Sequence, residues 1–196
     1  MAQTKLILDS NSYFRLAQNI HPLLSTPFGE EEFTLYIHAD LNAEFRSSFR
    51  LKTKFHWLNQ QVYADNRKRS LSLSNQNKKD IDSAYEFMWQ HVQEEFLEKK
   101  GTGPSQVDTR IVATAFVLGI EVVTDDADMI ELILEYDVGH LTSLGLMKRM
   151  LDCEHIDDEK IDQVVDQWMF DDDTPNGRWR DDFEELFDRE PPEPSF

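Results

Sequence analysis

The stretch DTRIVATAFVLGIEVVTDDADM, residues 108–129, constrains the fold more than any other part of the sequence. Its first half is an apolar run that predicts a buried helix ending before Gly119, because glycine is favoured just past a helix end. The β-branched segment IEVVT, residues 120–124, then predicts a buried strand. One aspartate opens this helix–strand unit and three close it, namely Asp108, Asp125, Asp126 and Asp128. These acids either cap helices or converge on a metal ion.

Other short runs predict further strands. KLILDS, residues 5–10, ends its apolar part at Asp9, FTLYI spans residues 33–37, and a further strand is expected near residues 138–142. Helical spacing of apolar residues covers 12–20, 39–55, 80–100, 106–118, 126–136, 143–152 and 157–169. Alternating strands and helices predict an α/β fold, an α/β/α sandwich around a mostly parallel central sheet. Ligands in such folds bind beyond the carboxyl ends of the strands, where Asp9 and Asp126 are expected.

Composition indicates one globular domain with a small extension. The 196 residues are 40% hydrophobic and 11% aromatic, which is enough to build a core. The single cysteine, Cys153, excludes an internal disulfide and a thiolate zinc cluster. We find neither a signal peptide pattern nor an apolar run long enough to cross a membrane, so we expect a cytoplasmic protein with no membrane partner.

The net charge of −18 is unevenly distributed along the chain. Acidic and basic residues balance over residues 1–100, and the excess acid lies beyond them. The domain expected over residues 1–150 therefore contains a basic segment at 46–79, whose serine-rich part from residue 64 predicts a flexible loop. Residues 151–196 predict an acidic helical extension with a solvated, disordered tail from about residue 170.

The basic segment 46–79 has the composition of an RNA-binding surface. It carries a single acid, Asp65, among its basic side chains, and Phe55, Trp57 and Tyr63 are available to stack on bases. An ordinary exposed loop and helix face explains the same composition equally well. The residues that we expect to contact RNA are Arg46, Arg50, Lys52, Lys54, Arg67, Lys68 and Arg69.

Helix capping explains each acid taken singly. The spacing from Ser105 to Asp108 fits a capping box, and Asp125 to Asp128 fits one less well. Asp9 is harder to explain in this way, because it directly ends a buried strand. Taken together, converging carboxylates repel each other unless a cation lies among them. Hard oxygen ligands favour Mg²⁺ or Mn²⁺, and such an ion assists phosphodiester hydrolysis.

In this order, the acids resemble those of the PIN-domain nucleases, a family that includes toxins of bacterial toxin–antitoxin pairs. The resemblance covers about residues 4–145. It rests on LILDSNS with Asp9, ADLNAEFRSS with Glu44, DTRIVATA with Asp108, and EVVTDDADM with Thr124, Asp126 and Asp128. No single motif is specific, and the ordered set carries the resemblance. The chain is longer than the compact toxins of the family.

The resemblance implies a PIN-like sandwich and an Mg²⁺- or Mn²⁺-dependent endoribonuclease. Its catalytic acids would be Asp9, Glu44, Asp108 and Asp126, with Asp9, Asp108, Asp126 and Asp128 at the metal and Thr124 holding the turn or a water. Asp40 lies one helical turn from Glu44 and is an alternative to it, and Asp125 is expected to be a solvated neighbour. The expected partners are an RNA substrate and a small antitoxin or other protein. A homodimer is left open.

Two other functions compete with this one. The sequence VVTDDAD after a strand also resembles the Asp-x-Asp of haloacid-dehalogenase-like phosphatases, but Lys148 and Lys160 lack the context that this family needs. The non-enzymatic alternative is a PIN-like scaffold that binds RNA or protein without cutting it. All four acidic positions of the family motif carry an acid in this sequence, which favours an active enzyme. The net charge of −18 favours the scaffold.

Overall fold

The computed structural model describes residues 3–39, 41, 45, 49–68 and 71–195. These residues form a four-stranded sheet in the order β2-β1-β3-β4, with every neighbouring pair parallel. The strands are β1 (Lys5–Leu8), β2 (Thr34–Ile37), β3 (Glu121–Val123) and β4 (His140–Leu141). The α/β class with a parallel central sheet is thus confirmed, and the four strands lie where the sequence predicts them.

Helices surround the sheet and connect its strands. They are α1 (Ser10–Ala17), α3 (Phe49–Lys54), the 3₁₀ turn η1 (His56–Asn59), α4 (Gln61–Asn66), α5 (Asn75–His91) with its π-helical continuation η2 (Val92–Leu97), α6 (Gln106–Leu118), α7 (Ala127–Glu135), α8 (Ser143–Asp152), α9 (Asp158–Phe170) and α10 (Trp179–Phe187). No helix in the described ranges is both long enough and apolar enough to cross a bilayer. Gly119 ends α6 in the left-handed conformation, as its position in the sequence predicts.

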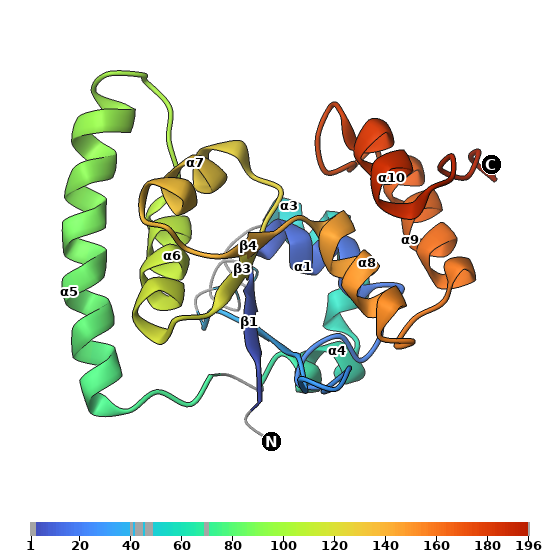
Figure 1. Ribbon diagram of the computed structural model, residues 1–196, viewed down its shortest axis with the longest axis horizontal. Coiled ribbons are helices and arrows are strands. Elements are labelled where there is room, and N and C mark those ends of the chain that lie inside the picture. Colours follow the sequence, from blue (N-terminus) through green and yellow to red (C-terminus); the bar gives the residue numbers. More distant parts are fainter. Residues whose placement is uncertain (1–2, 40, 42–44, 46–48, 69–70, 196) are drawn as a thin grey trace.

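The helices lie in two layers on opposite faces of the sheet. Figure 1 shows α5, α6 and α7 on one side of the strands and α1, α8, α9 and α10 on the other. The side chains of the strands alternate between these layers: Leu6 and Leu8 join the core under α1 and α8, and Ile7 joins the core under α6 and α7. In β3, Val123 and Val122 divide in the same way. Burial on both faces explains why these strands are almost continuously apolar.

The strand order places a topological switch point between β1 and β3. From β1 the chain moves to β2 on one side, and it later returns to form β3 on the other side. In parallel sheets the crevice beyond the carboxyl ends of such strands is where ligands bind. Asp9 follows β1, and Asp126 follows β3 by three residues, so both acids lie at this crevice.

The structure differs from the sequence prediction in the basic segment. Residues 64–79 are not one flexible loop, because α4 extends to Asn66 and α5 already begins at Asn75. Ser74 caps α5 by accepting a hydrogen bond from Asn77 N. The sequence places this helix start near Asp80, one and a half turns too late, because the polar residues 75–79 hide the helical period.

The C-terminal segment is folded where the sequence predicts a disordered tail. Helix α10 buries Trp179 and Phe183, and both join the core that contains Leu8 and Tyr13. The side chain of Trp168 on α9 is also buried there. The boundary expected at residue 150 falls inside α8, which packs against α10. The high acid content of this segment misleads because Trp168, Trp179 and Phe183 anchor its helices in the core, while most of its acids lie on the outer faces.

Candidate functional site

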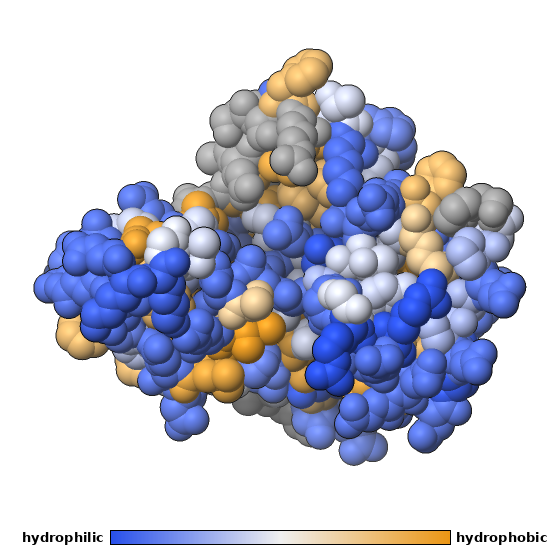
Figure 2. All heavy atoms as spheres, turned by 90° about the horizontal axis from the view of Figure 1, so that it is seen from above, coloured by the Kyte–Doolittle hydropathy of each residue, from blue (hydrophilic) through white to orange (hydrophobic). Residues whose placement is uncertain are grey.

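Three of the predicted acids line one small polar cavity at the switch point. The cavity has a volume of about 150 Å³ and is lined by Asp9, Ser10, Asn11, Ser105, Val107, Asp108 and Asp126. It lies where α1, α6 and α7 begin, so three helix N-termini meet around it. The surface that faces the viewer above the carboxyl ends of the strands is largely hydrophilic, with apolar residues in smaller patches (Figure 2).

Asp9 is the most buried of the three acids. It is 3% exposed and caps α1, with Oδ1 accepting a hydrogen bond of 2.5 Å from Ser12 N. Its Oδ2 accepts a second hydrogen bond, of 2.6 Å, from Thr124 Oγ1. Burial away from water raises the pKa of Asp9 to about 6, against the lowering effect of these hydrogen bonds. The negative charge of Asp125 raises this pKa further.

Thr124 joins the two central strands at their carboxyl ends. Its buried hydroxyl donates to Asp9 Oδ2, which follows β1, and accepts a hydrogen bond of 3.1 Å from Asp126 N. One side chain therefore fixes both the carboxylate of Asp9 and the backbone turn that leads into α7. The resemblance implies that Thr124 holds the turn or a water, and its hydrogen bonds to Asp9 and to the backbone of Asp126 lie at this turn.

Asp108 forms the capping box that its spacing predicts. Asp108 Oδ2 accepts from Ser105 N at 3.0 Å, and Ser105 Oγ accepts from Asp108 N at 3.2 Å. Burial raises the pKa of Asp108, and the negative charge of Asp126 raises it further. Asp108 on α6 and Asp126 at the start of α7 line the same cavity, so two like charges are brought to one site.

Asp126 is the N-cap of α7, with Oδ1 accepting a hydrogen bond of 2.9 Å from Met129 N. Asp128 lies in the first turn of the same helix but does not line the cavity. The structure therefore brings together Asp9, Asp108 and Asp126, and leaves Asp128 outside their cavity.

Asp125 is not the solvated neighbour that the sequence suggests. Its carboxylate is fully buried and pairs with Arg15 at 3.0 Å. It also accepts hydrogen bonds from Ser143 N at 2.8 Å and from Ser143 Oγ at 2.5 Å. The expectation is wrong because residues that follow a strand alternate in direction, so Asp125 faces α1 and α8 and its neighbour Asp126 faces the cavity. No local sequence signal marks this burial, because Arg15 on α1 lies 110 positions before Asp125 in the chain.

The basic residues expected at an RNA surface are divided between the exterior and the core. Arg67 is only 7% exposed, donates a hydrogen bond of 2.9 Å to Leu58 O and lies over the Phe45 ring. The prediction that Arg67 contacts RNA is therefore wrong. Lys52 is exposed, and Lys68 is exposed and pairs with Asp65 at 2.7 Å. Lys54 pairs with Asp173 at 3.2 Å. Arg46, Arg69 and the side chain of Arg50 lie outside the described residues.

The aromatic residues expected to stack on RNA bases pack against protein instead. Phe55 and Trp57 are each 6% exposed, and Trp57 contacts Tyr63 edge to face with 4.6 Å between the ring centroids. Phe55 and Trp57 form part of the core under α1, so the prediction that they stack on RNA bases is wrong.

The helical acid of the resemblance, Glu44, and its alternative Asp40 lie outside the described residues.

The residues around the cavity suit a hard divalent cation in their chemistry. Carboxylate, hydroxyl and amide oxygens are available, and the described lining contains no basic side chain. The raised pKa values of Asp9 and Asp108 have the same origin, a buried or crowded negative charge that a cation would stabilise. Within the described ranges, however, no group of three His, Cys, Asp or Glu side chains is already arranged to hold a metal ion.

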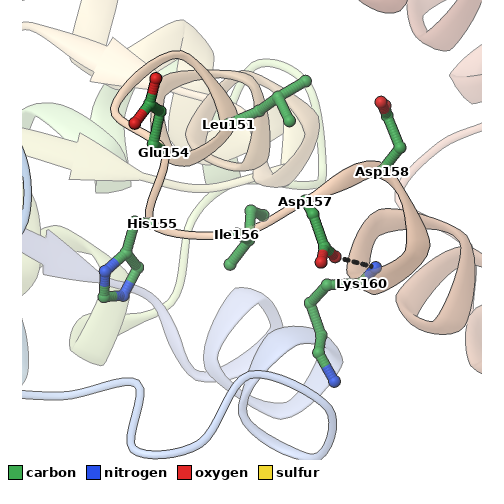
Figure 3. A pocket seen from close by; sticks show the side chains of 7 residues that line it. All are labelled: Leu151, Glu154, His155, Ile156, Asp157, Asp158 and Lys160. Carbon is green, nitrogen blue, oxygen red and sulfur yellow. Dashed lines mark hydrogen bonds between the residues drawn. The ribbon is translucent and has the colours of Figure 1, made fainter.

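A larger hollow lies away from the cavity of Asp9, Asp108 and Asp126, in the turn between α8 and α9. Its volume is about 470 Å³, and Figure 3 shows His155 and Lys160 among the side chains around it. Asp157 Oδ1 accepts a hydrogen bond of 2.8 Å from Lys160 N and so caps α9 (Figure 3). Its polar groups include acids and bases without a common orientation, so we place no chemistry there.

Comparisons of the chain with protein-family models, with curated proteins and with solved structures find no match.

Proposed function

We propose that the protein is an Mg²⁺- or Mn²⁺-dependent endoribonuclease. The observation that carries this proposal is the convergence of Asp9, Asp108 and Asp126 on one polar cavity at the switch point of a parallel sheet. The acids come from the start of three different helices, α1, α6 and α7, and more than a hundred residues separate the first from the last.

Asp9, Asp108 and Asp126 would hold the cation. When bound, a divalent ion polarises the scissile phosphate and lowers the pKa of an attacking water. Thr124 holds the carboxylate of Asp9 and the backbone of Asp126 in place through its two hydrogen bonds. Asn11 and Ser105 add neutral hydrogen-bond donors at the wall of the cavity, where they can orient phosphate oxygens.

The substrate proposed for this site is RNA, with exposed basic residues as contacts for its backbone. Lys52 and Lys68 are exposed and remain candidates. A role as the toxin of a toxin–antitoxin pair belongs to the same proposal. It implies a small partner protein whose basic side chain pairs with the carboxylates of the cavity.

The second candidate is a scaffold that binds RNA or protein without cutting it. One observation favours it: Asp9, Asp108 and Asp126 all cap helices, so each carboxylate already has a structural role. A capping role alone requires no cation and no particular protonation state. The two candidates therefore differ in what a neutral, isosteric side chain does at these positions.

Substitution by asparagine separates capping from metal binding. Asparagine caps helices about as well as aspartate, so Asp108→Asn and Asp126→Asn should keep the fold. If the acids hold a cation, Mn²⁺ or Mg²⁺ raises the melting temperature of the wild type. Both variants should lose this stabilisation, and they should also fail to cleave a single-stranded RNA. Asp128→Asn is the matched control, because Asp128 begins the same helix but lies off the cavity.

Two results would argue against the nuclease. If neither ion stabilises the wild type and RNA stays intact, the acids are caps and the scaffold is favoured. If Asp128→Asn abolishes binding as fully as Asp126→Asn, the cavity is not the metal centre.

A further inference from the structure

The turn that carries Thr124 and Asp126 is held from the side opposite the cavity as well. Asp125, between them, points away from the cavity, and its carboxylate is fully buried. Asp125 Oδ1 accepts from Ser143 N at the start of α8, and Oδ2 accepts from Ser143 Oγ and from Arg15. A buried carboxylate with these three donors has a fixed position, and so does the backbone on either side of it.

Arg15 links this carboxylate to the C-terminal segment. Its guanidinium donates to Asp125 Oδ2 at 3.0 Å, to Asp173 O at 3.2 Å and to Asp173 Oδ1 at 3.5 Å. Arg15 O in turn accepts a hydrogen bond of 2.9 Å from Trp168 Nε1 on α9. The planar guanidinium presents its donors in a rigid fork that bridges two acceptor groups in one fixed geometry, whereas the three donors of an ammonium group rotate freely on a flexible stem.

Asp173 is itself anchored in the loop between α9 and α10. Its backbone N donates a hydrogen bond of 2.9 Å to Trp168 O, and its Oδ2 pairs with Lys54 at 3.2 Å. The side chain of Asp173 is 25% exposed, and that of Arg15 is 11% exposed. Along this chain of contacts, the side chains therefore become more buried from Asp173 through Arg15 to Asp125.

We propose that Arg15 and Asp173 are positioning residues for the cavity acids, acting through Asp125 on the Thr124–Asp126 turn. The C-terminal segment is then a support of the candidate site and not an independent appendage. This inference rests on the proposed function for its consequence in metal binding. Its structural part, the ordering of the turn by Asp173 and Arg15, can be measured without a metal.

Two substitutions test the contact while leaving Asp125 with a cationic neighbour. Arg15→Lys keeps the positive charge but loses the rigid fork of donors that holds Asp125 and Asp173 in one geometry. Asp173→Asn removes the charge of the more exposed partner and leaves its backbone acceptor for Arg15 in place. The matched control is Asp172→Asn, which removes the same charge from the adjacent, exposed residue. Any general loss of attraction for cations appears equally in Asp172→Asn and Asp173→Asn.

The measurements are Mn²⁺ affinity by titration calorimetry and hydrogen exchange at the Asp126 amide, which donates to Thr124 Oγ1. We expect Arg15→Lys and Asp173→Asn to weaken Mn²⁺ binding about tenfold, as the loss of outer partners of a metal site does. Both should speed exchange at Asp126 and leave exchange in α5 unchanged. Asp172→Asn should match the wild type in each measurement.

The outcomes distinguish this inference from the proposed function. If the wild type binds Mn²⁺ and both variants bind it as tightly as Asp172→Asn does, Arg15 and Asp173 are not positioning residues. If the wild type does not bind Mn²⁺, the nuclease proposal fails, and the exchange rate of Asp126 alone decides the inference. Unchanged exchange in both variants then overturns it, and faster exchange confined to the turn supports it.

Discussion

Thr124 Oγ1 donates a hydrogen bond of 2.6 Å to Asp9 Oδ2 and joins two residues that lie 115 positions apart in the sequence. The same hydroxyl accepts from Asp126 N, so it satisfies a buried acceptor and a donor at once. Removing it leaves two polar groups without this partner in a site where water has little access. The bond is consequently as important for the stability of the sheet edge as for the arrangement of the acids.

Thr124→Val should therefore destabilise the protein although it preserves the shape of the side chain. We expect a loss of about 2 to 3 kcal/mol, because unsatisfied buried groups retain their full desolvation cost. Urea denaturation at neutral pH measures this free energy. Thr124→Ser keeps the hydroxyl and is the control, and equal losses in both variants would mean that packing matters more than the hydrogen bonds.

The raised pKa of Asp9 predicts how stability depends on pH in the absence of metal. Its pKa of about 6 in the folded protein exceeds the value of 3.8 for an unperturbed aspartate, so the folded state binds more protons between these values. Stability should therefore decrease as the pH rises from about 4 to about 6, by at most about 3 kcal/mol. The raised pKa of Asp108 acts in the same direction.

Asp9→Asn checks this dependence, since an amide does not titrate. Urea midpoints measured from pH 4 to pH 7 should decline less steeply in this variant than in the wild type. Asp172→Asn should retain the wild-type slope, because Asp172 is exposed. A wild-type midpoint that rises steadily over this range would show that Asp9 is not destabilised by its burial.

Phe183 provides a test of how firmly the C-terminal segment belongs to the fold. Its side chain is fully buried in the core beside α8, whereas Phe170 on α9 is 66% exposed. Phe183→Ala should cost about 3 to 5 kcal/mol, as other core truncations of phenylalanine do. Phe170→Ala should change stability by less than about 0.5 kcal/mol. Thermal melting of both variants compares them, and a small effect of Phe183→Ala would place α10 outside the cooperative unit.

Gly119 and Gly177 form a pair that isolates the cost of a left-handed backbone. A Cβ atom at either glycine would meet no atom within 4 Å, but only Gly119, with φ of 62°, needs the left-handed region. Gly119→Ala should destabilise by about 1 kcal/mol from backbone strain alone. Gly177→Ala should be neutral or slightly stabilising. Denaturant titration of the two variants gives the difference directly.

The sequence predicts the strands well because their signal is local. Short apolar β-branched runs followed by acids mark β1 and β3, and the capping box at Ser105 marks the start of α6. The rule for parallel sheets predicts Asp9 and Asp126 at the cavity, and the resemblance to PIN-domain nucleases adds Asp108. The alternation of strands with helices predicts a mostly parallel sheet, and the structure shows every neighbouring pair to be parallel.

Burial that depends on distant partners is harder to predict from sequence. Asp125 and Arg67 are charged, so composition places them at the surface, but Asp125 pairs with Arg15 and Arg67 bonds to Leu58 O. Neither partner is within reach of a local motif. The C-terminal segment misleads for a related reason: its acidic residues dominate its composition, whereas Trp179 and Phe183 decide where it packs. The helical acid, Glu44 or Asp40, stays a prediction.

The central place of β1 in the sheet has a consequence for biosynthesis. Both neighbours of β1 follow it in the chain, and β3 leaves the ribosome only after more than a hundred further residues. At translation rates of about 5 to 20 residues per second, one edge of this apolar strand waits roughly 5 to 25 seconds for its partner. During that interval β1 resembles the exposed edges through which nascent chains aggregate. Helix α1 and strand β2 are therefore the elements that can pack against β1 before β3 is synthesised. Any chaperone that assists this chain should bind its N-terminal residues before the cavity of Asp9, Asp108 and Asp126 forms.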